Sequence, residues 1–67
     1  MTVHDVRNTL GKRVHYRNDR MFIDADYIFG AYVIRAVNGK ATEQAELTDL
    51  CDNSVIVVPL ADVELKG

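Results

Sequence analysis

The chain has 67 residues, of which 48% are hydrophobic and 27% charged, and its formal net charge at pH 7 is −2. A chain of this length forms at most one domain and buries only about 60% of the surface that it exposes when unfolded, which excludes a deep, walled active site. Its longest apolar stretches, at 27–34 and 55–61, are too short for a membrane span, which needs about 20 residues. We therefore expect one small folded domain and no membrane partner.

The N-terminal sequence has no apolar run after a basic cluster, and the single cysteine, Cys51, cannot form an internal disulfide. Both features are typical of a protein of a reducing, cytoplasmic compartment. A domain this small, without disulfides or an evident metal site, is often stabilised by self-association. A homodimer is therefore a plausible state.

Residues 2–10 are expected to form a short helix. Thr2 and Asp5 have the spacing of a capping box, and Val6 and Leu10 fall on one side. Because two helical turns are not stable alone in water, we expect Val6 and Leu10 to pack against an open end of a sheet.

From residue 12 to 17 the residues alternate, which is typical of a half-buried strand. Val14 and Tyr16 are expected to face the core, and the outward face is then a basic row of Arg13, His15 and Arg17. The next segment, 18–26, mixes polar turn residues with one brief apolar run, and we expect it to form a long loop.

Three strands are expected in the second half of the chain, at 27–37, 40–50 and 54–58. The first contains Gly30, where a bend or bulge would be needed. Asn38-Gly39 predicts a two-residue hairpin turn to the second strand, because both residues tolerate positive φ. The third strand is so rich in Val and Ile that we expect it to be buried on both sides.

The end of the chain, 59–65, is expected to leave this ladder at Pro59 and to form one helical turn and a last short strand. Five short strands, two tight hairpins and a helical turn before the last strand resemble the SH3-like small β-barrel. The residues that carry the resemblance are those at 11–16, the strands joined at Asn38-Gly39, and those at 54–65, and the match covers roughly residues 11–65.

This resemblance implies a mainly β chain in which residues 1–67 form a single SH3-like domain, a five-stranded small barrel with a short N-terminal helix. The fold implies no single activity, because it hosts peptide binders, RNA binders, ribosomal domains and enzyme subunits. The chain has no Trp, so it departs from the pattern of SH3 domains that clamp proline-rich peptides. The segments YVIR (32–35), QAELTD (44–49) and SVIV (54–57) also resemble small uncharacterised proteins of phages and mobile elements.

The charge is divided along the chain, with a net +3 over residues 1–40 and a net −5 over residues 41–67. A nucleic-acid interface is therefore one alternative function, and its cations would be Arg7, Lys12, Arg13, His15, Arg17 and Arg20. The simpler interpretation is a solvated strand whose cations pair with Glu43, Glu46 or Asp49 on neighbouring strands.

No catalytic motif is present. The chain has neither a phosphate-binding glycine loop nor a second cysteine. His4, His15 and Cys51 lack the close ligand pairs of a zinc site. We therefore expect no enzyme activity, no metal and no cofactor.

The function that we predict from the sequence is that of a non-catalytic interaction module with a protein partner. Its binding residues would lie in and beside the loop at 18–26, where Arg, Met and aromatic side chains occur together, as they do at interface hot spots. These residues are Arg20, Met21, Phe22 and Tyr27. A structural subunit of a larger complex is a third alternative.

Overall fold

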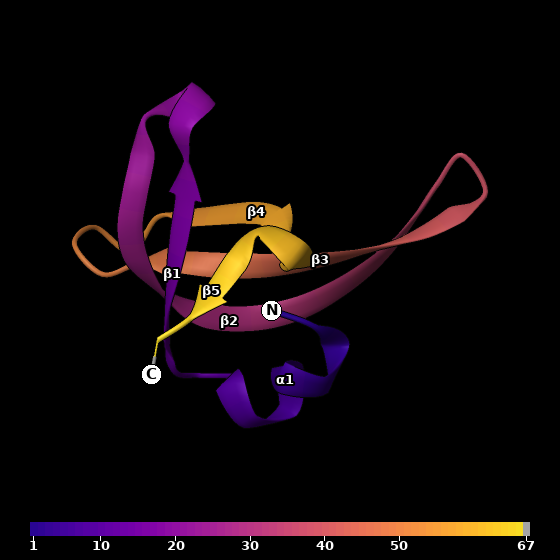
Figure 1. The fold of residues 1–67 in the computed structure, drawn as a ribbon, viewed down its shortest axis with the longest axis horizontal. Coiled ribbons are helices and arrows are strands. Elements are labelled where there is room, and N and C mark those ends of the chain that lie inside the picture. Colours follow the sequence, from indigo (N-terminus) through magenta and orange to yellow (C-terminus); the bar gives the residue numbers. More distant parts are fainter. Residues whose placement is uncertain (67) are drawn as a thin grey trace.

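The computed structural model describes residues 1–66. Its strands are β1 (Arg13–Asn18), β2 (Ile23–Val37), β3 (Lys40–Asp49), β4 (Val55–Pro59) and β5 (Val63–Leu65). Its helical elements are α1 (Val3–Thr9) and two 3-10 turns, η1 (Asp19–Met21) and η2 (Leu60–Asp62). The strands form one antiparallel sheet in the order β4-β3-β2-β1-β5 (Figure 1). The chain is mainly β, as predicted. Its sheet is not closed into a barrel, because β4 and β5 remain the two edges.

Helix α1 begins where the sequence predicts. The Thr2 backbone N–H and hydroxyl both donate to Asp5 Oδ2, at 2.9 and 3.1 Å. Val6 packs in the core, but the prediction that Leu10 is buried is wrong, because the helix ends before it and its side chain is exposed. The exit from the helix is tied to the sheet by the Gly11 N–H, which donates to the Phe29 carbonyl at 2.8 Å.

The segment 18–26 is a hairpin and not the long loop that we predicted. Strand β1 continues to Asn18, η1 makes the turn, and β2 begins at Ile23, which pairs with Asn18. The two aspartates that we interpreted as turn residues, Asp24 and Asp26, lie on β2 and pair in register with Arg17 and His15. These aspartates in fact alternate with Ala25, which packs against the core, as expected of a strand with one buried face.

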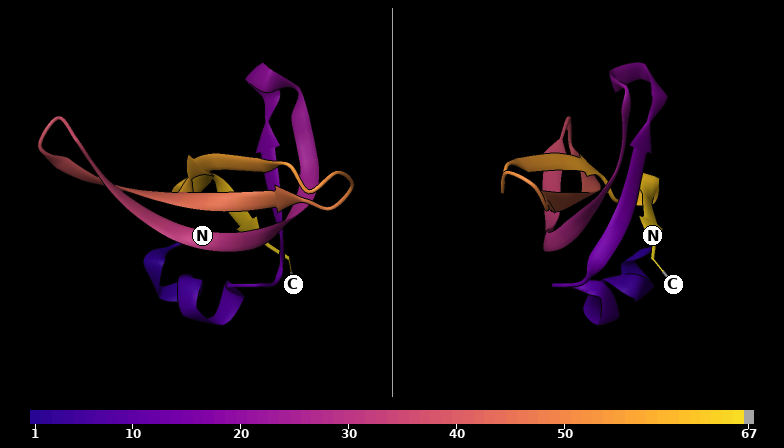
Figure 2. Two further views of the ribbon diagram at one scale, coloured as in Figure 1. Left: turned by 180° about the vertical axis from the view of Figure 1, so that it is seen from behind. Right: turned by 90° about the vertical axis from the view of Figure 1, so that its left-hand side faces the viewer.

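Strand β2 is long and bent, and it joins the two halves of the sheet. Residues 23–28 pair with β1, whereas residues 27–37 pair with β3. The pairing register shifts between Phe29 and Ala31, so Gly30 lies in the bulge that the sequence predicts. Figure 2 shows the ribbon curving through this point, so that the first half of β2 stands at an angle to β3.

The β2–β3 hairpin turns at Asn38 and Gly39, with φ of 51° and 77°, and Val37 pairs with Lys40. This confirms the predicted two-residue turn. The hairpin extends well past α1, β4 and β5 as a free arm (Figure 1).

The prediction that β4 is buried on both sides is wrong. Ile56 and Val58 face the core, but Val55 and Val57 are 51% and 44% exposed. An apolar run of this kind is typical of a central strand, yet the topology places β4 at an edge of the sheet.

The core lies between the curved sheet, α1 and η2. Its buried members come from every strand, and the predicted helical turn and last strand are both present. They are Val6, Val14, Tyr16, Tyr27, Phe29, Ala45, Leu47, Val58, Leu60 and Val63. None of the helices in residues 1–66 has the length and the apolar character to cross a membrane.

Candidate functional site

The end of the β1–β2 hairpin carries three consecutive exposed side chains, Arg20, Met21 and Phe22, which we call the hairpin tip. Met21 is 66% exposed and Phe22 is 95% exposed. The hairpin rises away from the rest of the fold, so the tip stands apart from β3 and β4 (Figure 1). The structure thus brings together three of the four residues that we predicted to bind a protein.

The backbone of the hairpin tip is held by Asn18. Its Oδ1 accepts hydrogen bonds from the backbone N–H groups of Arg20 and Met21, at 3.1 and 3.3 Å. Its Nδ2 donates to the hydroxyl of Tyr16, a buried residue, at 3.0 Å. The turn is therefore connected to the core through one side chain, which fixes how the tip is presented.

Phe22 adopts a left-handed backbone conformation, with φ 56° and ψ 39°. For a bulky L-residue this conformation costs on the order of 1 kcal/mol. The fold gains no burial from the Phe22 ring in return, because the side chain is almost wholly in solvent. Strain at an exposed aromatic side chain favours a role in recognition over a role in stability.

Tyr27 is the predicted binding residue that the structure separates from this surface. It is only 6% exposed and packs edge-on against Tyr16, with ring centroids 6.4 Å apart. Burial also raises the pKa of its hydroxyl. Tyr27 therefore belongs to the core, and we remove it from the candidate surface.

The basic row on β1 is flanked by carboxylates. His15 Nδ1 lies 2.8 Å from Asp26 Oδ1, and His15 Nε2 lies 2.6 Å from Asp24 Oδ1. The hydrogen bond to Asp26, and then the one to Asp24, raise the pKa of His15. His15, followed by Lys66, lowers the pKa of Asp26. Because both ring nitrogens face carboxylates, the arrangement is that of an imidazolium clamped by two anions.

The remaining cations proposed for nucleic-acid binding do not form one row. Arg17 pairs with Asp19 at 2.9 Å, and Arg20 lies at the hairpin tip. Arg7 lies on α1, at the opposite end of the molecule from the tip (Figure 1). Lys12 and Arg13 are exposed at the start of β1. The acidic partners of this row are Asp19, Asp24 and Asp26, and not the Glu43, Glu46 or Asp49 that we expected.

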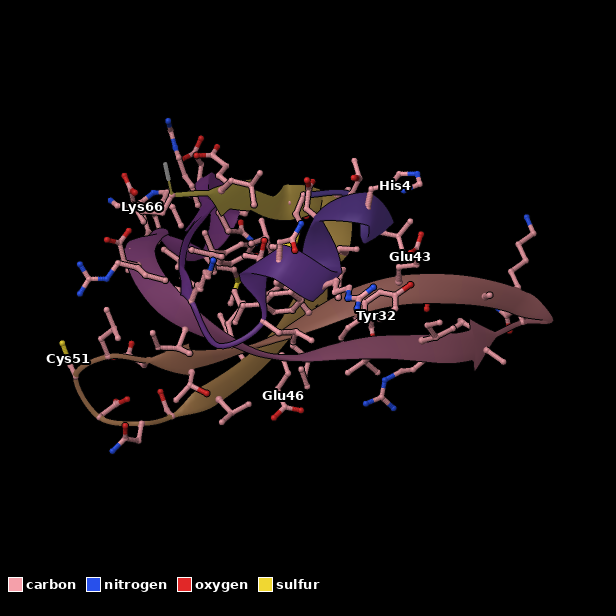
Figure 3. The ribbon with its side chains drawn as sticks, turned by 90° about the horizontal axis from the view of Figure 1, so that it is seen from below. His4, Tyr32, Glu43, Glu46, Cys51 and Lys66 are labelled. Atoms are coloured by element: carbon pink, nitrogen blue, oxygen red, sulfur yellow. The ribbon has the colours of Figure 1, made fainter. Side chains whose placement is uncertain are left out.

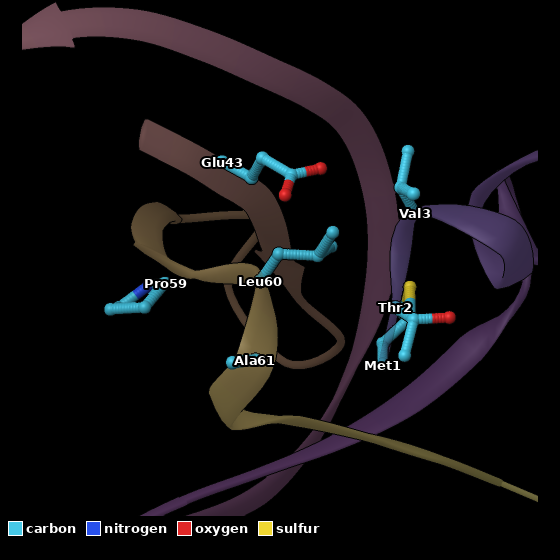
Figure 4. Close-up of a pocket in the computed structure, with 7 residues that line it drawn as sticks. All are labelled: Met1, Thr2, Val3, Glu43, Pro59, Leu60 and Ala61. Atoms are coloured by element: carbon cyan, nitrogen blue, oxygen red, sulfur yellow. The ribbon is translucent and has the colours of Figure 1, made fainter. Parts of the chain in front are cut away.

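A shallow pocket of about 390 Å³ lies between the N-terminus, β3 and η2 (Figure 4). No sequence pattern indicated this pocket, since its residues come from three separate segments: Met1, Thr2, Val3, Glu43, Pro59, Leu60 and Ala61. Its one charged side chain, Glu43, accepts a hydrogen bond from the Tyr32 hydroxyl at 2.6 Å, and the two side chains lie together in Figure 3. This bond raises the pKa of Tyr32. The pocket contains no pair of groups suited to acid–base or nucleophilic chemistry.

Within residues 1–66, no three His, Cys, Asp or Glu side chains are arranged to hold a metal ion. The His15 ring lies between Asp24 and Asp26, so these three groups do not converge on one point. Cys51 is exposed at the turn between β3 and β4 (Figure 3).

Comparison of the chain with family models, with curated proteins and with solved structures found no match.

Proposed function

We propose that this protein is a non-catalytic interaction module that presents the hairpin tip to a protein partner. The observation that carries the proposal is Phe22, a strained aromatic residue that is 95% exposed. The fold keeps a conformation that costs it stability, and Asn18 holds the turn that precedes Phe22 through hydrogen bonds from the backbone N–H groups of Arg20 and Met21. Both facts support a surface that is pre-organised for binding.

The three side chains of the hairpin tip indicate the chemistry of the partner surface. Phe22 and Met21 would fit an apolar recess on the partner. The cation of Arg20 would pair with a carboxylate at the rim of that recess. Asp19 already pairs with Arg17, which leaves Arg20 with no acidic partner within the described residues. We therefore propose a partner with an apolar, acid-rimmed groove.

We also propose that the sheet belongs to the SH3-like class. The strand order β4-β3-β2-β1-β5, the bulged β2 and the 3-10 turn before β5 support this assignment. The origin that we propose, among accessory proteins of phages or mobile elements, rests only on the sequence resemblance at 32–35, 44–49 and 54–57. An exposed free thiol at Cys51 is compatible with a reducing, cytoplasmic setting.

Capture from the native cells with two variants tests the proposed function. Phe22→Gly removes the ring and relieves the strained backbone, whereas Ile34→Ala truncates another exposed apolar side chain on β2, far from the tip along the strand. We expect a protein that is retained by the wild type and by Ile34→Ala, and lost with Phe22→Gly. Equal retention by Phe22→Gly would contradict the proposal.

A salt titration with duplex and single-stranded nucleic acid tests the alternative. Phosphate binding would weaken steeply as salt rises, and it would be lost in an Arg13→Ala, Arg17→Ala double variant. Because carboxylates flank this row, we expect no such binding.

A further inference from the structure

The outer edge of β4 carries unpaired backbone groups. The Asp49 N–H donates to the Ser54 carbonyl at 2.8 Å, so Ser54 directs its carbonyl toward β3 at the start of the β3–β4 ladder. This direction alternates along antiparallel strands, so Ile56 and Val58 direct their backbone groups toward β3. The residues that alternate with them direct their backbone groups toward the open edge. These are Val55, Val57 and Pro59.

This edge lacks the usual protection against pairing. Natural edge strands are guarded by charged side chains, bulges or prolines. Strand β4 contains no charged residue, and the described register has no bulge between β3 and β4. Pro59 is the only protecting residue, and it removes one N–H at the last position of the strand.

We propose that β4 pairs antiparallel with β4 of a second copy of this chain, across a two-fold axis at Val57. In this register the two Val57 residues exchange both of their backbone hydrogen bonds. Each Val55 N–H then donates to the Pro59 carbonyl of the other copy, so the missing N–H of Pro59 leaves only the Val55 carbonyl without a donor. The two sheets thereby become one continuous sheet.

The side chains on this edge favour a second copy over a charged foreign strand. The pairing sets Val57 against Val57 and Val55 against Pro59, so every new pair on the outward face is apolar and uncharged. Val57, half-exposed in the single chain, is then covered by Val57 of the other copy, and Val55 is covered by Pro59 of the other copy. The nearest outward-facing carboxylate on β3, Glu46, points away from the sheet (Figure 3). The two Glu46 residues stay about 14 Å apart, three strand spacings, which is beyond the Debye length at physiological salt.

Cysteine cross-linking tests both the interface and its register. In a Cys51→Ser background, Val57→Cys would place two thiols opposite each other with Cα atoms about 5.5 Å apart, within disulfide range. The matched control, Val55→Cys, would leave its two copies about 13 Å apart along the strands. Under mild oxidation we expect a covalent dimer from Val57→Cys and none from Val55→Cys. Equal cross-linking of both variants, or of neither, would overturn the proposal.

Sedimentation velocity measures the same association without covalent chemistry. We expect the wild type to shift from monomer to dimer as its concentration rises. Val57→Lys introduces a charge at the two-fold axis and should stay monomeric, while Ile34→Lys, the same change at another exposed apolar position on β2, should still dimerise. A wild type that is monomeric up to millimolar concentration, or a dimer that Val57→Lys leaves intact, would overturn the proposal. If Val57→Lys fails to fold by circular dichroism, the cross-linking pair decides.

Discussion

His15 shows how a single side chain can couple the β1–β2 hairpin to pH. The imidazole lies between Asp24 and Asp26 of β2, and Lys66 reaches Asp26 from beyond β5 at 3.0 Å. Glu64 of β5 is the register partner of His15 on its other side. Both strands that pair with β1 therefore bring carboxylates to this ring, and the competing cations are Lys66 and, on β1 itself, Arg13 and Arg17.

These contacts predict a loss of stability above neutral pH. Folding raises the pKa of His15 above its ordinary value of 6.5, so its contribution is complete below pH 6.5 and is lost as pH rises through the raised pKa. Asp26 has the opposite sign, because its pKa is lowered from 3.8 and its contribution disappears only in acid. Urea unfolding of the wild type should therefore show stability that decreases as the pH rises above 6.5.

His15→Gln should remove this decrease, because glutamine keeps hydrogen-bonding capacity but does not titrate. His4→Gln is the matched control, since His4 is exposed on α1 and makes no hydrogen bond to a carboxylate in the described residues. If the stability of His15→Gln changed with pH as that of the wild type does, the contacts of His15 with Asp24 and Asp26 would not contribute to stability.

At the scale of the elements, the two bends of the β2–β3 hairpin place different demands on glycine. Gly39 has φ 77° and open space where a Cβ would be, so its requirement is conformational. Gly30 lies in the bulge without positive φ, and a Cβ there would meet Thr48 Oγ1 at 3.4 Å, an ordinary contact distance.

We therefore expect Gly39→Ala to lower the free energy of unfolding by about 1 kcal/mol. Gly30→Ala should change it by less than about 0.5 kcal/mol, because the new methyl group meets Thr48 Oγ1 and the Glu46 carbonyl at ordinary contact distances of 3.4 and 3.5 Å. Chemical denaturation of the two variants measures the difference. A larger loss of unfolding free energy in Gly30→Ala than in Gly39→Ala would contradict this prediction. It would mean that the bulge tolerates a side chain less well than the turn does.

The elements also show what the sequence could and could not predict. The Asn38-Gly39 turn, the capping residues Thr2 and Asp5, and the alternation around Val14 all depend on local chemistry, and all were predicted correctly. The segment 18–26 was misread because η1 is held by a side-chain contact from Asn18 that no spacing reveals. The exposure of Phe22 was predicted, whereas Tyr27, predicted beside it, lies on the buried face of β2, where aromatic residues in apolar runs usually lie.

At the scale of the whole molecule, the sequence identifies strands but not their neighbours. Composition predicts that β4 is fully buried, whereas strand order decides that it lies at an edge. The pocket beside η2 was missed for the same reason, because long-range contacts bring its residues together.

Association through β4 predicts that heat stability depends on concentration. Because pairing binds only the folded chain, mass action should raise the midpoint of thermal unfolding as the chain concentration increases. Differential scanning calorimetry over a hundredfold range of concentration measures this shift. In Val57→Lys the midpoint should be the same at every concentration, and a midpoint in the wild type that does not move would contradict the dimer.

Three side-chain-bearing residues in this fold adopt the left-handed conformation, each at the end of a hairpin: Phe22, Asn38 and Asn53. Asparagine accepts that geometry readily, and phenylalanine does not. If the hairpin tip binds as proposed, homologues that share the interaction should keep an aromatic residue at position 22 despite its strain. Homologues without the interaction should carry glycine or asparagine there, which adopt this conformation at lower cost.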